Sequence, residues 1–203
     1  MPETRASRRA RREVRRQAFV DAALAVFAAK GVAATSVDDI VRAAGVAKGT
    51  FYLYFATKDD AVDAVAEAMV EGVAQRMEAL ASAPGRSPVE RLLGFAVAVD
   101  EIGGEPHERD LIEIFHRPEN RPVHDRMSER AVARLTPLIA EVVADGIADG
   151  LFRRQDPDRA AAFVVACLAS LHEVVNDPAE VPAATAHLNA FVLRGLGFEG
   201  DVQ

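Results

Sequence analysis

Residues that donate hydrogen bonds gather between positions 35 and 58 of this 203-residue chain. They comprise two lysines, five residues with hydroxyl groups and one glycine. The residues are Thr35, Ser36, Lys48, Gly49, Thr50, Tyr52, Tyr54 and Lys58. Ammonium and hydroxyl groups donate to phosphate oxygens, and such side chains also reach the edges of bases. The chemistry that this stretch predicts is contact with nucleic acid.

We expect different contacts from different members of this set. Lys48 and Thr50 are best placed for base edges or phosphates, and Gly49 lets the backbone approach DNA closely. Tyr52 and Tyr54 end in hydroxyls that suit phosphate. Lys58 is expected to anchor to the DNA backbone from the start of the next helix, where backbone amides also face outward.

Short helices must position these donors. The apolar periodicity and the turn residues predict helices at about 12–30, 36–44, 47–54 and from 58 to 81. Ser36 and Asp39 have the spacing of a capping box at the start of the second helix. For Thr35 and Ser36, a capping role and a phosphate contact both stay open. Three short helices with Gly45 in the turn between the second and third are typical of a helix-turn-helix.

The composition favours an all-helical protein. Half of the residues are apolar, so the chain can bury a substantial core. Only 6% are aromatic, and turn clusters at hairpin spacing are lacking, so a β architecture has little support. The one cysteine, Cys167, excludes an intramolecular disulfide and a cysteine-rich metal site.

Charge is distributed unevenly along the chain. Residues 1–60 hold eleven Lys and Arg against seven Asp and Glu, although the whole chain has a net charge of -7. A basic head on an acidic body predicts that only the head meets a polyanion, and it disfavours an architectural DNA protein, which is basic throughout. Residues 1–17 are predicted as an Arg-rich flexible arm, either a solvated tail or a DNA contact.

Other function classes lack their sequence signatures. No run of eighteen apolar residues could span a membrane, and Asp21 interrupts the stretch that could mimic an export signal. The chain has no P-loop, Gly-x-Ser-x-Gly, His-Glu-x-x-His or Gly-x-Gly-x-x-Gly motif. We therefore expect a cytoplasmic protein that is not an enzyme and has no cofactor.

Histidines and acidic residues gather between positions 105 and 125. The segment contains one Glu-x-x-His pair, Glu113 and His116, together with His107 and His124. A metal site needs four converging ligands, and a di-iron bundle needs that pair twice. Because a charged helix surface gives the same pattern, we predict no metal site.

The stretch from Gly31 to Val62 resembles the DNA-binding region of TetR/AcrR-type regulators. The similarity lies in Thr35–Ser36–Val37, Asp39–Ile40, Ala43–Ala44–Gly45–Val46, Lys48–Gly49–Thr50–Phe51–Tyr52, Tyr54–Phe55 and Lys58. The resemblance covers about a quarter of the chain; beyond it, only the segment 146–152 and the Asp-Pro-Asp at 156–158 look like the family. One position departs from the pattern: Ala47 stands where a serine often caps the reader helix, so a side-chain cap is lost.

The resemblance implies the organisation of the whole chain. Residues 18–60 would form a three-helix helix-turn-helix domain, and residues 61–203 a larger antiparallel helical domain for effector binding and dimerisation. The function implied is that of a transcriptional regulator, a repressor that binds a palindromic double-stranded DNA operator as a homodimer. An unknown small-molecule effector would release it.

The larger domain is expected to contain helices at 88–102, 108–115, 123–148, 157–176 and 179–196, with Pro137 kinking or splitting the third of these. The last two helices carry apolar faces that we predict form the dimer interface, through Leu168, Leu171, Val174, Leu188, Phe191 and Val192. The effector pocket is predicted near Phe95, Phe115, His116, Met127 and Phe163. For both sets, ordinary core packing remains the alternative.

Overall fold

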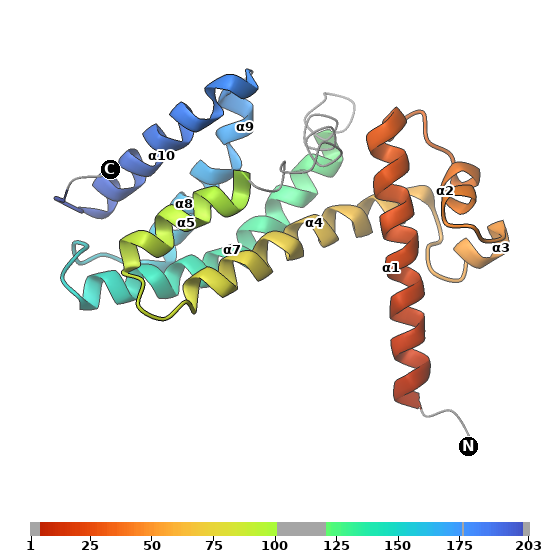
Figure 1. Cartoon of the computed structure of the whole chain (residues 1–203), viewed down its shortest axis with the longest axis horizontal. Coiled ribbons are helices and arrows are strands. Elements are labelled where there is room, and N and C mark those ends of the chain that lie inside the picture. Colours follow the sequence, from red (N-terminus) through yellow and green to blue (C-terminus); the bar gives the residue numbers. More distant parts are fainter. Residues whose placement is uncertain (1–4, 101–120, 176, 201–203) are drawn as a thin grey trace. The chain divides into compact units, whose positions relative to one another are not determined.

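A computed structural model describes residues 5–100, 121–175 and 177–200, and every regular element in those ranges is helical (Figure 1). The prediction of an all-α protein is confirmed. The elements are α1 Arg5–Lys30, α2 Val37–Ala43, α3 Lys48–Phe51, α4 Lys58–Ala81, α5 Pro88–Asp100, α7 Arg121–Ala148, α8 Pro157–Ala169, α9 Leu171–Val174, the 3₁₀ helix η3 Pro178–Glu180, and α10 Val181–Leu196. The chain forms two compact units: unit 1 contains residues 1–69 and 103–127, and unit 2 contains residues 70–102 and 128–203.

Helix α1 begins earlier than predicted. It starts at Arg5, so residues 5–17, which we expected to form a flexible arm before a helix from Arg12, are its first turns. The segment is rich in Arg and Ala, both strong helix formers, and it contains neither Gly nor Pro. The sequence pattern underestimated this helix because an arginine-rich segment has little apolar periodicity to detect.

Aromatic rings form the core of unit 1. Phe19, Phe27 and Phe51 are fully buried, and Phe55 nearly so. The Phe19 and Phe51 rings meet edge to face with their centroids 5.7 Å apart. Each buried Phe contributes about 1.5–3 kcal/mol relative to an exposed one, so this cluster fixes the short α2 and α3 onto the longer α1. Ile40 of α2 is also fully buried.

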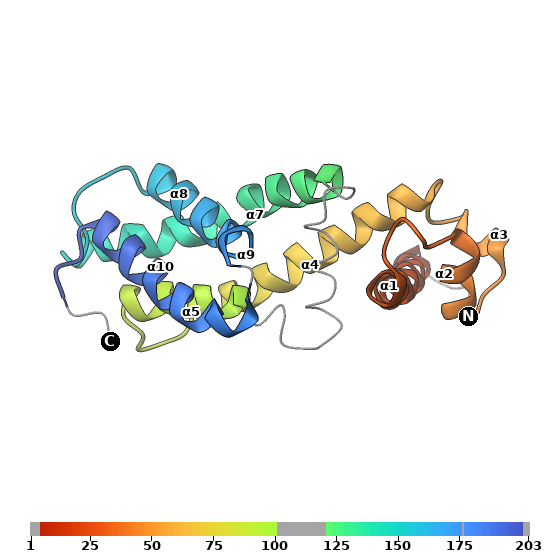
Figure 2. The same cartoon turned by 90° about the horizontal axis from the view of Figure 1, so that it is seen from above.

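The core of unit 2 joins residues from α4, α5, α7, α8 and α10. Phe95, Met77, Ile139 and Leu193 are its largest buried side chains. Helix α10 packs against α5 and α8, and Figure 2 shows it beside α5. Arg134 of α7 reaches two acids of α4, with Nε 3.0 Å from Glu71 and Nη2 2.5 Å from Glu78. Arg134 lowers the pKa of Glu71, and the two carboxylates raise that of Arg134.

A tight turn ends α7 in the segment that resembles the family. The amides of Leu151 and Phe152 donate to the Gly146 carbonyl, at 2.9 and 3.0 Å, and Gly150 has a φ of 72°. A side chain at Gly146 would collide with Phe152, because its Cβ would lie 2.1 Å from the ring. The small residue therefore lets the aromatic ring fold back onto the helix end.

One other prediction of helix bounds is wrong, and one of the two alternatives at Pro137 is excluded. The helix expected at 157–176 breaks at Ser170 into α8 and α9, and the Ser170 hydroxyl donates to the Ala166 carbonyl at 2.7 Å, a bond that competes with regular helix. Helix α7 continues through Pro137 as one element, so the split that we gave as one of two alternatives there does not occur. The helix expected at 108–115 lies outside the described residues.

Candidate nucleic-acid interface

The turn between α2 and α3 has the predicted geometry. Gly45 has a φ of 68°, a left-handed conformation that residues with a side chain rarely adopt, and the Val46 amide closes the turn onto the Val41 carbonyl at 3.0 Å. Helix α3 has four residues, fewer than predicted. Its N-cap Ala47 makes no side-chain hydrogen bond, as we expected from the missing serine.

Three of the predicted contacts lie accessible on or beside α3. Lys48 and Tyr52 have about half of their side chains exposed, and Thr50 is half-buried. The Lys48 ammonium pairs with Asp38 of α2, with Nζ 2.9 Å from Oδ2. The Asp38 hydrogen bond raises the pKa of Lys48. The lysine is thus held beside the start of α3 by a carboxylate that phosphate or a base would have to replace.

Gly49 is exposed and has no structural need to be glycine. Its φ is not positive, and a Cβ built on it would meet nothing within 4 Å in this chain. The missing side chain matters only to a molecule that approaches from outside. This supports the expectation that the backbone at α3 comes close to a partner.

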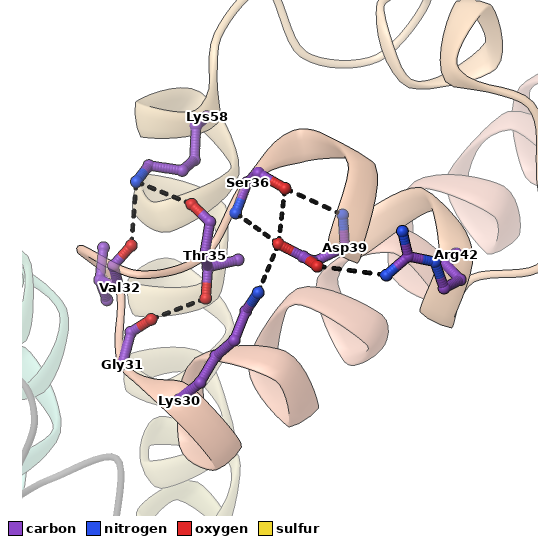
Figure 3. Close-up of polar contacts among 8 residues, drawn as sticks. All are labelled: Lys30, Gly31, Val32, Thr35, Ser36, Asp39, Arg42 and Lys58. Atoms are coloured by element: carbon purple, nitrogen blue, oxygen red, sulfur yellow. Dashed lines mark hydrogen bonds and ion pairs between the residues drawn. The ribbon is translucent and has the colours of Figure 1, made fainter.

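Ser36 is a helix cap (Figure 3). Its amide donates to Asp39 Oδ2 at 2.9 Å, and the Asp39 amide donates to Ser36 Oγ at 3.3 Å, which confirms the predicted capping box. Asp39 also binds Lys30 at the end of α1 and Arg42 on α2. The Lys30 hydrogen bond, with those from Ser36, holds the pKa of Asp39 well below its usual range.

Thr35 and Lys58 face into unit 1 (Figure 3). Thr35 is only 4% exposed, and its hydroxyl donates to the Gly31 carbonyl at 2.6 Å. The Lys58 ammonium donates to the carbonyls of Val32 and Thr35 at 2.9 and 3.0 Å. Lys58 was predicted as a phosphate contact, and for Thr35 a capping role and a phosphate contact both stayed open. Because their donors bond backbone carbonyls of the segment between α1 and α2, the interface proposed below is built without them, and their phosphate contacts stay predictions.

Tyr54 belongs to a groove that we did not predict. Its ring packs against Phe19, with centroids 5.4 Å apart, and the Arg12 guanidinium lies 6.0 Å from the ring centroid. The groove is lined by Arg8, Arg11, Arg12, Arg15, Leu53 and Tyr54. The spacing of the arginines in the sequence could have indicated this groove. In a flexible arm this spacing has no structural consequence, whereas in a helix it places the arginines on one face.

The structure describes three of the predicted effector residues, and each has different surroundings. Phe95 is fully buried in the core of unit 2, and Met127 packs against the core of unit 1. Phe163, predicted to face inward, is 68% exposed on α8. Phe115 and His116 lie outside the described residues. Phe95 is thus part of the packed core of unit 2, the alternative that the sequence left open for it, and its effector contact stays a prediction.

The predicted dimer residues divide into two groups. Leu168 and Leu171 are buried, and Leu188 and Val192 are partly buried against the core that contains Leu168. Two of the set, Val174 and Phe191, are exposed. The physical reason is that one helix carries both a core face and an outer face, and the apolar pattern of α8 and α10 does not distinguish them. Phe163 and Phe191 line an apolar groove of about 250 Å³ with Cys167.

Two negative findings apply to the described residues alone. Within residues 5–100, 121–175 and 177–200, no three His, Cys, Asp or Glu side chains are grouped as metal ligands would be. Across the same ranges, no helix is both long enough and apolar enough to cross a membrane.

The α2–turn–α3 arrangement defines a helix-turn-helix protein, and comparisons identify the family. The profile "Bacterial regulatory proteins, tetR family" matches residues 19–65, and "Tetracyclin repressor-like, C-terminal domain" matches residues 123–186. The chain belongs to the TetR/AcrR family of regulators.

Curated relatives match part of the chain. The repressor KstR2 of Mycobacterium tuberculosis is 32% identical over 48% of this chain and 48% of its own, and AcrR of Shigella flexneri is 34% identical over 51% and 49%. The chain thus spans about half the length of these relatives.

Solved structures match almost the whole chain. A TetR-family regulator of Pectobacterium atrosepticum has a TM-score of 0.75 at 23% identity, covering 98% of this chain and all of that one. The SmeT–triclosan complex has a TM-score of 0.70 at 21% identity, covering 90% and 91%. A regulator of Thermobifida fusca is 26% identical with a TM-score of 0.65, covering 89% and 97%. The first two likenesses show the shared fold.

Proposed function

We propose that this chain is a transcriptional regulator that binds a palindromic DNA operator as a homodimer and represses until a small-molecule effector releases it. The observation that carries the proposal is α3, a short helix fixed by a buried aromatic core, with Lys48, Gly49, Thr50 and Tyr52 on or beside it and open to a partner. As a transcriptional regulator, the protein would act in the cytoplasm and would not be an enzyme.

The residues of the reader helix divide between two kinds of contact. Lys48 and Thr50 read base edges in the major groove, Gly49 brings the backbone close, and Tyr52 donates its hydroxyl to phosphate. Ser36 lies at the exposed start of α2, where its hydroxyl donates to Asp39 Oδ2, and it adds a phosphate contact when that hydroxyl turns from Asp39 to DNA. Tyr54 contributes from the arginine-lined groove.

Selection of bound sequences from random DNA tests the DNA-binding part. A dimer that reads two half-sites about one helical turn apart should recover two-fold symmetric sequences. Lys48→Ala and Thr50→Ala should relax preference at particular positions by about 1–3 kcal/mol per contact. Tyr52→Phe should weaken binding to all sequences alike. If Lys48→Ala and Thr50→Ala also lower the affinity for all DNA sequences alike, Lys48 and Thr50 only position the protein on DNA, and their assignment as base-reading residues is wrong.

The dimer interface that we propose lies on the outer faces of α8, α9 and α10. Phe163 and Phe191, 68% and 67% exposed, line one apolar groove, and Val174 on α9 is 76% exposed. Large exposed apolar side chains are typical of protein contacts. The interface proposed here keeps Phe191 and Val174 from the predicted set and adds Phe163.

Charge placed at this face should prevent pairing. Phe191→Glu should sediment as a monomer and lose operator binding. Val97 on α5, 49% exposed in the same unit, is the matched control, and Val97→Glu should remain a dimer. Equal sedimentation of the two variants would place the interface elsewhere.

The effector part of the proposal rests on likeness to a protein of the same fold, whose structure was solved with triclosan. Repeating the selection with candidate small molecules present should reveal loss of operator binding with one of them. A compound that binds unit 2 and leaves DNA affinity unchanged would contradict release as the mode of regulation.

A further inference from the structure

An arginine-lined groove runs along unit 1 beside the end of the reader helix. Four arginines of α1 and two residues that follow α3 form its walls: Arg8, Arg11, Arg12, Arg15, Leu53 and Tyr54. None of the six is acidic, and the groove has a volume of about 390 Å³. A concave basic surface of this kind favours a polyanion over a neutral ligand.

The early start of α1 makes this surface regular. On a helix, residues at i, i+3, i+4 and i+7 share one face, and Arg8, Arg11, Arg12 and Arg15 have this spacing. Because a helix rises about 1.5 Å per residue, Arg8 and Arg15 lie about 10 Å apart along the axis. One DNA strand rises about 3.4 Å per nucleotide, so the arginine stripe is long enough for about three nucleotides.

The side chains at the groove suit a sugar–phosphate backbone. Guanidinium groups donate several hydrogen bonds in a fixed planar arrangement that matches phosphate oxygens. The Arg12 guanidinium lies near the Tyr54 ring, 6.0 Å from its centroid, so a cation lies beside an aromatic ring that carries a hydroxyl. Leu53 is 69% exposed and offers an apolar surface for a sugar ring.

Arg16, on the same helix, contacts an acidic and an aromatic side chain of unit 1. Its Nη2 lies 3.3 Å from a carboxylate oxygen of Glu67 on α4, and its guanidinium lies 5.7 Å from the centroid of the Phe55 ring. Arg16 therefore holds α1 to α4. It is not one of the groove residues.

We propose that this groove binds the phosphate backbone of double-stranded DNA next to the major groove that α3 reads. The inference rests on the proposed DNA-binding function and adds a second, sequence-independent contact surface to it. The α1 stripe increases affinity for every DNA sequence, while α3 supplies the preference among them.

Salt dependence of binding is the direct measure of such contacts. For each phosphate that a cation neutralises, the slope of log K against log salt changes by about 0.9, and each substitution acts twice in a dimer. Arg8→Gln should therefore lower the slope by about 2, and the double variant Arg8→Gln/Arg15→Gln by about 4. Glutamine retains a high helix propensity, so α1 is expected to stay helical.

Arg9 is the matched control. It is exposed on the same turn of α1 but does not line the groove, and Arg9→Gln removes the same charge. The full-length dimer is titrated with the selected operator duplex and with a random duplex of equal length. We expect Arg8→Gln to lose slope on both duplexes and Arg9→Gln to keep the parental slope on both.

Two outcomes separate this inference from the proposed function. Equal slopes for Arg8→Gln and Arg9→Gln would overturn the groove, even if the operator remains preferred over random DNA. If the protein does not prefer the selected duplex over the random duplex, the proposed function is overturned. In that case, a salt slope that falls only in the groove variants would still support the arginine contact. Hydroxyl-radical footprints should also show protected sugars that the double variant loses.

Discussion

Lys58 supports the loop between α1 and α2 from inside unit 1, so its replacement should damage stability more than it damages DNA contacts. Its ammonium donates to the carbonyls of Val32 and Thr35 at 2.9 and 3.0 Å. Lys58→Met keeps much of the aliphatic stem and removes both donors. The variant leaves two backbone acceptors without their charged partner.

The expected cost follows from these two bonds. A hydrogen bond to a charged group contributes about 1.5–3 kcal/mol, but Lys58 is only half-buried, so water can replace part of the loss. We expect the free energy of unfolding to fall by about 2 kcal/mol, well below the sum of two fully buried charged bonds. The salt slope of DNA binding should change little, because the ammonium is already committed to carbonyls.

Urea unfolding followed by far-ultraviolet circular dichroism measures the loss, and Lys48→Met is the control. Lys48 is about half exposed in an ion pair with Asp38, so water screens the pair and its removal should cost little stability. Hydrogen exchange at the amides of residues 31–36 should accelerate in Lys58→Met alone. Equal stability of the two variants, together with a lower salt slope for Lys58→Met, would refute this reasoning and restore Lys58 as a phosphate anchor.

Three further changes test other parts of the structure. Asp38→Asn removes the carboxylate that pairs with Lys48. The variant should bind random DNA several-fold more tightly, and the ratio of operator affinity to random-DNA affinity should fall in parallel titrations. Gly146→Ala drives a Cβ to 2.1 Å from the Phe152 ring and should cost about 1–3 kcal/mol in urea unfolding, whereas Gly72→Ala, where a Cβ meets nothing, should stabilise the helix by about 0.5–1 kcal/mol. Folding lowers the pKa of Asp39, so its contribution to stability should be complete above its unfolded pKa of about 3.9 and should be lost as pH falls toward the folded value. In Asp39→Asn, the free energy of unfolding should therefore depend less on pH in the acid range.

Each of these has a contrary outcome. Unchanged affinity of Asp38→Asn for random DNA would mean that the carboxylate does not compete with phosphate. Similar stabilities of the two alanine variants would show that the ring at 152 moves aside without cost. If the free energy of unfolding of Asp39→Asn has the same acid pH dependence as that of the parent, the Lys30–Asp39 pair does not contribute to the stability of unit 1.

Local chemistry could be predicted from the sequence. The capping box of Ser36 and Asp39, the left-handed turn at Gly45 and the missing cap at Ala47 each depend on residues within a few positions of one another. Spacing alone determines which backbone groups such side chains can reach. The all-α fold and the helix-turn-helix followed from the same local signals.

Distant contacts were decided only by tertiary structure. Lys58 was predicted as a phosphate anchor, and nothing in the sequence indicates that its ammonium also donates to carbonyls more than twenty positions earlier. Phe163 and Leu168 lie on one helix and differ little in apolar character, yet one is exposed and the other buried, because burial depends on which neighbours pack against each face.

The arginine groove shows both contributions. The sequence by itself determined the charge and spacing of Arg8, Arg11, Arg12 and Arg15. The local preference of Arg and Ala makes the segment helical, and tertiary structure determined that Tyr54 lies beside it, through the packing of Phe19 in the core of unit 1. Spacing becomes a surface only when the backbone has one conformation, and the buried aromatic core supplies the free energy that fixes it.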